Sequence, residues 1–126
     1  MHFAISATYG PTDPTRAMLP FLFAASAVQA GDQVTLMLFA DSVLMAVESV
    51  GARLVPVGPP NRYEDIAGHP SVTLVACKPC MEARGLSAAV LDKRIKLGVS
   101  DALDAEGTLF HHARAAHRHV GVELQV

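Results

Sequence analysis

Residues 72–85 read VTLVACKPCMEARG, and this stretch changes character half way along. Its first part, residues 72–76, is a continuous apolar run of the kind that forms a strand buried on both faces of a parallel sheet. Its second part, residues 78–84, has a helical pattern and is followed by a glycine, which often ends a helix. Cys77 and Cys80, the only two cysteines of the chain, lie where the strand gives way to the helix. This order predicts an α/β fold.

The same alternation of strand and helix runs through the rest of the chain. Apolar runs predict strands over residues 3–7, 34–40, 72–76, 95–99 and 120–126. Capping and stop signals predict helices over residues 14–30, from Asp41 and Ser42 to Gly51, over 78–84 and over 101–117. Residues 54–57 fit a short strand or an extended loop, and residues 63–67 fit one helical turn. The pattern predicts a three-layer α/β/α sandwich with a mostly parallel sheet of about five strands, forming a single domain over residues 1–126.

Composition narrows the functional classes. The chain has 126 residues, of which 51% are hydrophobic, so it can bury a core and is not expected to be disordered. Ten basic and twelve acidic residues give a net charge of -2, which provides no electrostatic footprint for direct nucleic-acid binding or for anionic lipid. The N-terminal residues MHFAISATYG lack the features of a signal peptide, and no apolar run is long enough to span a membrane. We therefore expect a cytoplasmic protein without a membrane partner.

Three predicted turns fall on one edge of the sheet. In open α/β sheets the reactive groups lie beyond the carboxyl ends of the strands, and this edge would hold residues 8–13, Asp41 with Ser42, and residues 77–80. Thr8 and Tyr9 in the first turn are candidate substrate-binding residues, as is Lys78 in the third. Asp13 is a further candidate for the pocket lining. Each of the first-turn residues has an ordinary alternative role in a turn or a helix cap.

Cys77 is the favoured reactive group. It would lie at the first turn of a helix, where unpaired backbone N–H groups and the positive end of the helix dipole stabilise an anion. We therefore expect a lowered thiol pKa, with Lys78 adding positive charge. Cys80 lies on the same side of that turn and is a candidate resolving thiol. In a reducing cytosol, such a pair more often forms a thiol, redox or metal site than a structural disulfide.

The chain resembles a known family in two stretches. Residues 72–86, VTLVACKPCMEARGL, and residues 7–46, ATYGPTDPTRAMLPFLFAASAVQAGDQVTLMLFADSVLMA, resemble the DsrE/DsrF-like sulfur-relay family, which also includes the TusD subunit of a tRNA-thiolation relay. The informative features are a strand that ends in a cysteine, an Arg-Gly pair seven and eight positions later, a Pro-Thr-Arg-Ala helix start and an Ala-Gly-Asp-x-Val-Thr segment before the second strand.

This resemblance implies a function. It implies that Cys77 accepts a sulfane sulfur as a persulfide and passes it on, without a cofactor, so that the protein acts as a sulfurtransferase-like carrier. The implied partners are sulfur donor and acceptor proteins or small thiols, and the implied assembly is a homotrimer or homohexamer. Cys80 has no counterpart in the TusD-like branch. The first helix favours oligomerisation independently, because its apolar side chains spread around most of its circumference, notably Met18, Leu19, Phe21, Leu22 and Phe23.

Other interpretations stay open. Thioredoxin-like proteins also carry a strand-CxxC-helix arrangement, but their fold needs a later proline facing the cysteines and none follows Pro79. Thiol–disulfide redox activity on the present fold remains a second hypothesis, and a non-catalytic oligomeric module that binds a small ligand or a partner is a third. A flavodoxin-like phosphate loop matches SATYGPT only in part.

A metal site is not expected. Zinc would need two ligands besides the cysteines, and the candidates are His69 and the C-terminal histidines. Within HHARAAHRH, residues 111–119, no two histidines stand four positions apart, so this segment is interpreted as a solvated helix face.

Overall fold

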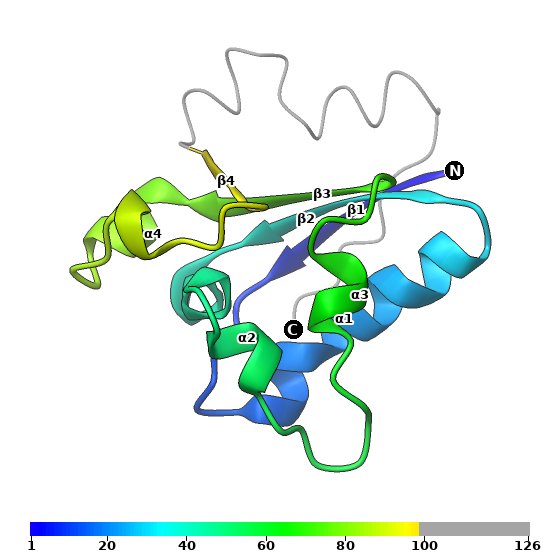
Figure 1. Ribbon diagram of the computed structural model, residues 1–126, viewed down its shortest axis with the longest axis horizontal. Coiled ribbons are helices and arrows are strands. Elements are labelled where there is room, and N and C mark those ends of the chain that lie inside the picture. The colour runs from blue at the N-terminus through cyan, green and yellow to red at the C-terminus, as the bar shows by residue number, and fades with distance from the viewer. Residues whose placement is uncertain (99–126) are drawn as a thin grey trace.

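A four-stranded parallel sheet forms the centre of the computed structural model, which describes residues 1–98 (Figure 1). The sheet has the order β1-β2-β3-β4, and its strands are β1 (His2–Ala7), β2 (Gln33–Leu38), β3 (Val72–Cys77) and β4 (Lys96–Gly98). The register pairs Ile5 with Leu36 and Leu36 with Leu74. Cys77, the last residue of β3, pairs with Gly98.

The helices lie between successive strands. They are α1 (Pro14–Gln29), the 3-10 helix η1 (Ala40–Ala46), α2 (Val50–Arg53), α3 (Tyr63–Ile66), α4 (Lys78–Glu82) and the 3-10 helix η2 (Ala88–Val90). Right-handed connections between successive neighbours of a parallel sheet fall on the same face. Accordingly, α1, α2 and α3 lie together on one side of the sheet (Figure 1).

The longest helix, α1, begins and ends at the signals that the sequence contains. The Asp13 side chain accepts a hydrogen bond from the backbone N–H of Arg16 at 3.2 Å, and Pro14 occupies the first helical position. After the helix, Gly31 has a φ of 86°, a left-handed conformation that glycine adopts without steric cost. The Met18 and Phe21 side chains of α1 are fully buried beneath the sheet.

Both faces of the sheet are buried. The face toward α1 contributes Ile5, Leu36 and Leu74 to the core. The other face is largely buried too: Ala4, Thr35, Met37 and Val75 are each 5% exposed or less, and Ser6 and Thr73 are half-buried. Burial on both faces is what the uninterrupted apolar runs predicted. The predicted α/β sandwich is therefore confirmed, with four strands in the described part of the chain.

Other predicted elements differ in detail. The helix expected from residues 41 to 51 is divided into η1 and the single turn α2. The break lies where Val47 is extended and bridges to Leu91, and where Ser49 has a left-handed φ of 72°. Residues 54–57 form an extended loop. The strand predicted over residues 120–126, the helix over 101–117 and the histidine-rich segment lie outside the described residues.

Less apolar surface is left on α1 than its sequence suggests. Leu22 and Phe23 are half-buried, and Phe23 packs edge-on against Phe3 with ring centroids 5.5 Å apart. Among the five large apolar side chains singled out above, Leu19 is the exposed one, at 39%. No helix within residues 1–98 is long and apolar enough to cross a membrane.

Candidate functional site

The carboxyl ends of β1, β2 and β3 bring three turns to one edge of the sheet. Ala7 pairs with Leu38, and Leu38 pairs with Ala76. The first turn packs closely on the second, because a Cβ atom at Gly10 would lie 2.4 Å from the carbonyl oxygen of Asp41. A residue with a side chain could not occupy this position without moving one of the turns. The sequence correctly placed these turns together.

Cys77 and Cys80 meet at the third turn. Cys77 ends β3 and caps α4, and its Sγ accepts a hydrogen bond from the backbone N–H of Cys80 at 3.4 Å. Both cysteines are free thiols. Cys77 is buried, at 6% exposed, whereas Cys80 is half-buried. The less accessible thiol is therefore the one that receives the backbone donor.

Burial governs the acidity of Cys77. Removal from water raises the pKa of its thiol above the ordinary value, and a side-chain hydrogen bond with Cys80 raises it further. The backbone N–H of Cys80 and the charge of Arg84 lower the pKa, but they do not offset burial. The lowered pKa expected from the sequence is therefore wrong. That prediction relied on the helix dipole to stabilise the thiolate. Because α4 has only five residues, its dipole is small.

Lys78 does not supply the positive charge near the thiol. Its Nζ lies 3.7 Å from Oε1 of Glu82, one turn further along α4. Arg84 is the cation that acts on Cys77. A role for Lys78 in substrate binding stays a prediction.

The pair of Arg84 and Asp41 joins the second turn to the third. Nε and Nη2 of Arg84 donate to Oδ1 of Asp41 at 3.0 and 2.8 Å, and Nη1 donates to the carbonyl oxygen of Cys80 at 3.0 Å. Sequence reasoning named Asp41 as an edge residue and Arg84 as half of an Arg-Gly pair. It missed their contact, because the two residues lie 43 positions apart.

The first turn has its own contacts. Nη1 of Arg16 donates to the Tyr9 hydroxyl at 3.4 Å, and the guanidinium lies 5.2 Å from the centroid of the Tyr9 ring. Asp13 serves as the cap of α1. Thr8 is exposed at the end of β1. Thr8 and Tyr9 remain candidate substrate-binding residues because of their place at the edge.

Two unusual features accompany the second turn. Ala40 has a φ of 49°, a left-handed conformation that is uncommon for a residue other than glycine. The hydroxyl of Ser42 is buried and has no hydrogen-bond partner within the described part of the chain. The chain thus changes direction sharply after β2, immediately before Asp41.

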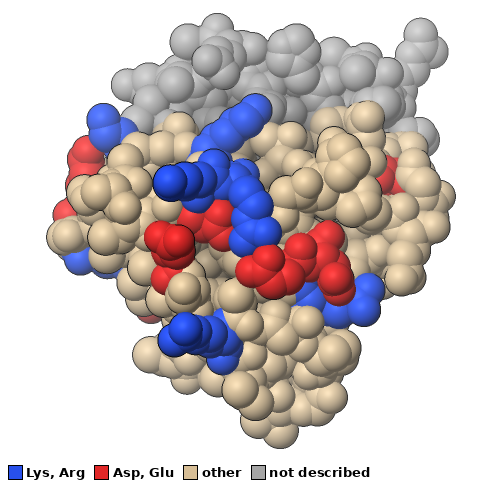
Figure 2. All heavy atoms as spheres, viewed as in Figure 1, with Lys and Arg blue, Asp and Glu red and all other residues tan. Residues whose placement is uncertain are grey.

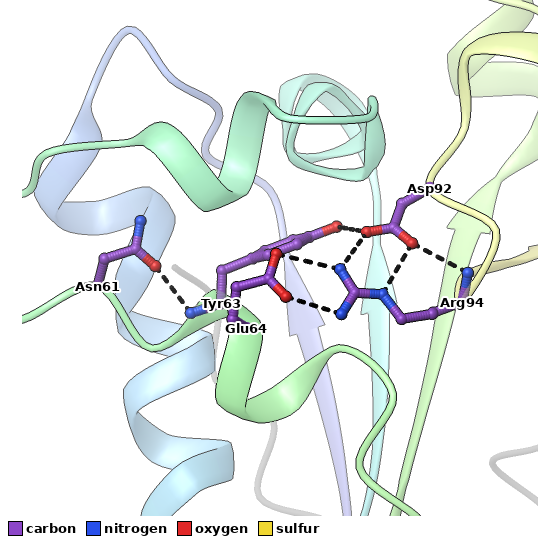
Figure 3. A network of polar contacts seen from close by, with 5 residues as sticks. All are labelled: Asn61, Tyr63, Glu64, Asp92 and Arg94. Carbon is purple, nitrogen blue, oxygen red and sulfur yellow. Dashed lines mark hydrogen bonds and ion pairs between the residues drawn. The ribbon is translucent and has the colours of Figure 1, made fainter.

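A second polar cluster is formed by Asn61, Tyr63, Glu64, Asp92 and Arg94 (Figure 3). Tyr63 donates its hydroxyl proton to Asp92 at 2.9 Å, and Arg94 forms ion pairs with both Asp92 and Glu64 at 2.8 Å. Asn61 accepts a hydrogen bond from the backbone N–H of Tyr63 at 2.8 Å. Hydrogen bonds from Arg94 hold the pKa of Asp92 at about 2, against the cost of burial. This network ties α3 to the segment before β4.

The face shown in Figure 2 has no strongly charged patch, and the cysteines line neither of two depressions within residues 1–98. Acidic and basic side chains lie interspersed on the face shown in Figure 2, without a broad patch of one sign. One depression of about 300 Å³ borders the Arg94 cluster. Another, of about 250 Å³, lies between α1 and α3. Neither of these two depressions is lined by the cysteines.

No group of three or more His, Cys, Asp or Glu side chains within residues 1–98 is placed to hold a metal ion. His69, the candidate zinc ligand, precedes β3, whereas Cys77 ends it. A six-residue strand spans roughly 17–20 Å, so His69 and Cys77 lie too far apart to share a metal. The C-terminal histidines lie outside the described residues.

Comparison with known proteins gives one family and two related folds. The family model described as the DsrE/DsrF-like family matches residues 1–120. The crystal structure of the YchN protein from E. coli is 16% identical, with a TM-score of 0.61 and full coverage of both chains. MTH1491 from Methanobacterium thermoautotrophicum, a protein of unknown function, is 9% identical, with a TM-score of 0.62, over 99% of this chain and 97% of its own. No curated protein matches the chain.

Proposed function

Because this chain belongs to the DsrE/DsrF-like family, whose members generally act in sulfur relay, we propose that Cys77 accepts sulfane sulfur as a persulfide and delivers it to an acceptor thiol. The observation that carries the proposal is the position of Cys77. It ends β3 at the carboxyl edge of the sheet, and a backbone N–H donates to its sulfur. A sulfur atom held in this way can bear negative charge during exchange.

The loading step is a nucleophilic exchange at sulfur. Cys77 loses its proton to solvent, and the thiolate attacks the outer sulfur of a donor persulfide, R–S–SH. A new S–S bond forms on Cys77 while the S–S bond of the donor breaks. The donor leaves as the thiolate RS⁻ with the electron pair of the broken bond. The backbone N–H of Cys80, which donates to Sγ of Cys77 at 3.4 Å, is placed to stabilise negative charge on the attacking sulfur.

The raised pKa of Cys77 affects this step directly. The resting thiol is mainly protonated at neutral pH, because burial and the Cys80 side chain favour the S–H form. Deprotonation must therefore precede attack, and loading becomes faster as the pH rises toward the thiol pKa.

Two routes can unload the sulfur. In the first, an acceptor thiolate attacks the outer sulfur of the persulfide and restores the Cys77 thiolate. In the second, the Cys80 thiolate attacks Sγ of Cys77 and displaces HS⁻, which leaves a Cys77–Cys80 disulfide. A two-electron thiol reductant must then restore both cysteines. The proposed partners are thus sulfur donor and acceptor proteins or small thiols.

Thiol–disulfide exchange is the second candidate function. The proximity of the two cysteines favours it, because both lie in one turn, where the backbone N–H of Cys80 donates to Sγ of Cys77 at 3.4 Å. In that case the pair would cycle between dithiol and disulfide, with an external thiol–disulfide couple exchanging the two electrons, and would carry no sulfane sulfur.

Release of bound sulfur by cyanide separates these functions. Full-length protein is incubated with polysulfide, freed of it by gel filtration, and treated with cyanide, which converts sulfane sulfur to thiocyanate. Wild-type protein and Cys80→Ser should release thiocyanate, and Cys77→Ser should release none. Equal release from Cys77→Ser and wild type would contradict the proposal, and no release from any of them would favour the redox function.

A further inference from the structure

We propose that Arg84 is a positioning residue of the thiol site: anchored by Asp41, it fixes the turn that donates to Cys77 and holds a positive charge beside the sulfur. This inference rests on the proposed function of Cys77. It goes further by naming the side chains that control the reactivity of that sulfur.

The first step is the anchor. Two nitrogens of Arg84 converge on one oxygen of Asp41 at 2.8 and 3.0 Å. The side chains are 30% and 58% exposed, so the ion pair adds little to stability. Its effect is directional, because two hydrogen bonds fix the plane of the guanidinium. Asp41 is itself located by its close packing on Gly10.

The second step is the turn. A carbonyl near the end of a helix lacks its usual partner, and the backbone N–H of Arg84 bonds the carbonyl of Met81 at 3.0 Å. The carbonyl of Cys80 is met by Nη1 of Arg84 instead, also at 3.0 Å. Residue 80 is therefore held at its carbonyl by Arg84, while its N–H donates to Sγ of Cys77.

The third step is charge. Arg84 lowers the pKa of Cys77 and so opposes the effect of burial. The other charged or titratable groups around α4 have different partners or the opposite effect. Lys78 pairs with Glu82, Asp41 is neutralised by Arg84 itself, and the Cys80 thiol raises the pKa of Cys77. Arg84 is thus placed to favour both the attacking thiolate and the anionic persulfide.

The test is the pH profile of alkylation. Full-length Cys80→Ser protein has Cys77 as its single thiol, so the rate of its reaction with iodoacetamide reports that thiol alone. Adding Arg84→Gln should slow the reaction at pH 7 by roughly threefold to tenfold and move the profile to higher pH. Arg84→Lys keeps the charge and should recover part of the rate. Arg53→Gln, which removes an exposed arginine of α2, serves as the matched control and should behave like the parent.

Asp41→Ala distinguishes an anchor from a simple negative charge, because it removes the oxygen that accepts both hydrogen bonds from Arg84. If Asp41 acts through Arg84, its substitution should slow alkylation in the parent, which retains Arg84. The same substitution should have no effect in the protein that already carries Arg84→Gln. A negative charge acting directly on Cys77 would instead give faster alkylation in both.

Two outcomes decide the inference. If Arg84→Gln and Arg84→Lys both remain folded by circular dichroism and their profiles superimpose on that of the parent, the inference is wrong. Arg84→Lys alone decides the matter if Arg84→Gln does not fold. Polysulfide loading of the same proteins tests the proposed function of Cys77 separately from the role of Arg84. A parent protein that gains no sulfur contradicts the proposed function. If the parent gains sulfur and the Arg84 variants gain it equally well, only the role of Arg84 is contradicted.

Discussion

At Cys77, burial and local hydrogen bonding act on the thiol in opposite directions. The side chain is 6% exposed, and burial is the largest influence on its pKa. A backbone N–H and a nearby guanidinium act the other way. A site of this kind keeps a thiol protonated at rest and still stabilises the anion when it forms.

The direction of this pKa shift can be measured. We expect the alkylation rate of wild-type Cys77, followed by tandem mass spectrometry, to rise with a midpoint above the roughly 8.5 of a free thiol. Cys80→Ala should lower the midpoint, because it removes the side-chain hydrogen bond that raises the pKa. A wild-type midpoint below the free-thiol value would show that the local donors outweigh burial.

Residue-scale predictions from the sequence succeeded where the signal is local. The place of Cys77 between strand and helix follows from neighbouring residues, so it was predictable. Its burial depends on the packing of remote elements, so its acidity was not. The contact between Arg84 and Asp41 was missed for the same reason.

At the scale of elements, the buried Asp92 carboxylate connects α3 to the segment before β4 (Figure 3). Its folded-state pKa of about 2 is depressed below the ordinary value of about 3.9. A depressed pKa stabilises the folded state above the unfolded pKa, and this stability is lost as the pH falls through the folded value. The carboxylate is 10% exposed, so we expect a contribution of about 2 kcal/mol at neutral pH.

Urea unfolding tests this element-scale claim. Asp92→Asn should lower the free energy of unfolding at pH 7 by about 2 kcal/mol or more, because Arg94 and Tyr63 lose a charged partner. The stability of the wild type should fall between about pH 4 and pH 2, and the variant should lose less over that range. Asp65→Asn, which removes an exposed carboxylate of α3 paired with Arg62, is the control. Equal losses in the two variants would contradict a special role for Asp92.

Elements were predictable where one strong pattern governs them. The apolar runs of β1, β2 and β3 and the cap of α1 are such patterns. The segment after Asp41 also looks helical, but the Val47–Leu91 bridge and the left-handed Ser49 divide it into two short helices. Leu91 is remote in sequence, so this break has no local signal.

At the scale of the whole molecule, the parallel α/β sandwich was predictable because alternating strands and helices admit few architectures. Assembly is a separate matter, and we propose a homotrimer or homohexamer with α1 at a subunit contact. The monomer supports a narrower apolar contact than the sequence suggested, since Leu19 is exposed whereas Leu22 is half-buried.

Because Leu19 is exposed and Leu22 is half-buried, Leu19 is the better position for a substitution that tests assembly. We expect static light scattering of the wild type to give a multiple of the 13.3 kDa chain mass, and Leu19→Glu to reduce it without unfolding the chain. Leu22→Glu is a poorer probe, because it also places a charge against the monomer core. A wild-type mass equal to that of one chain at micromolar concentration would contradict the proposed oligomer.

The central claim, that Cys77 carries the sulfur, is tested most directly by mass spectrometry after exposure to polysulfide. Wild-type protein and Cys80→Ser should each gain about 32 Da per sulfur atom, fragment ions should place the gain on Cys77, and reductant should remove it. Cys77→Ser should gain nothing. A gain that persists in Cys77→Ser and disappears in Cys80→Ser would contradict the claim and assign the persulfide to Cys80.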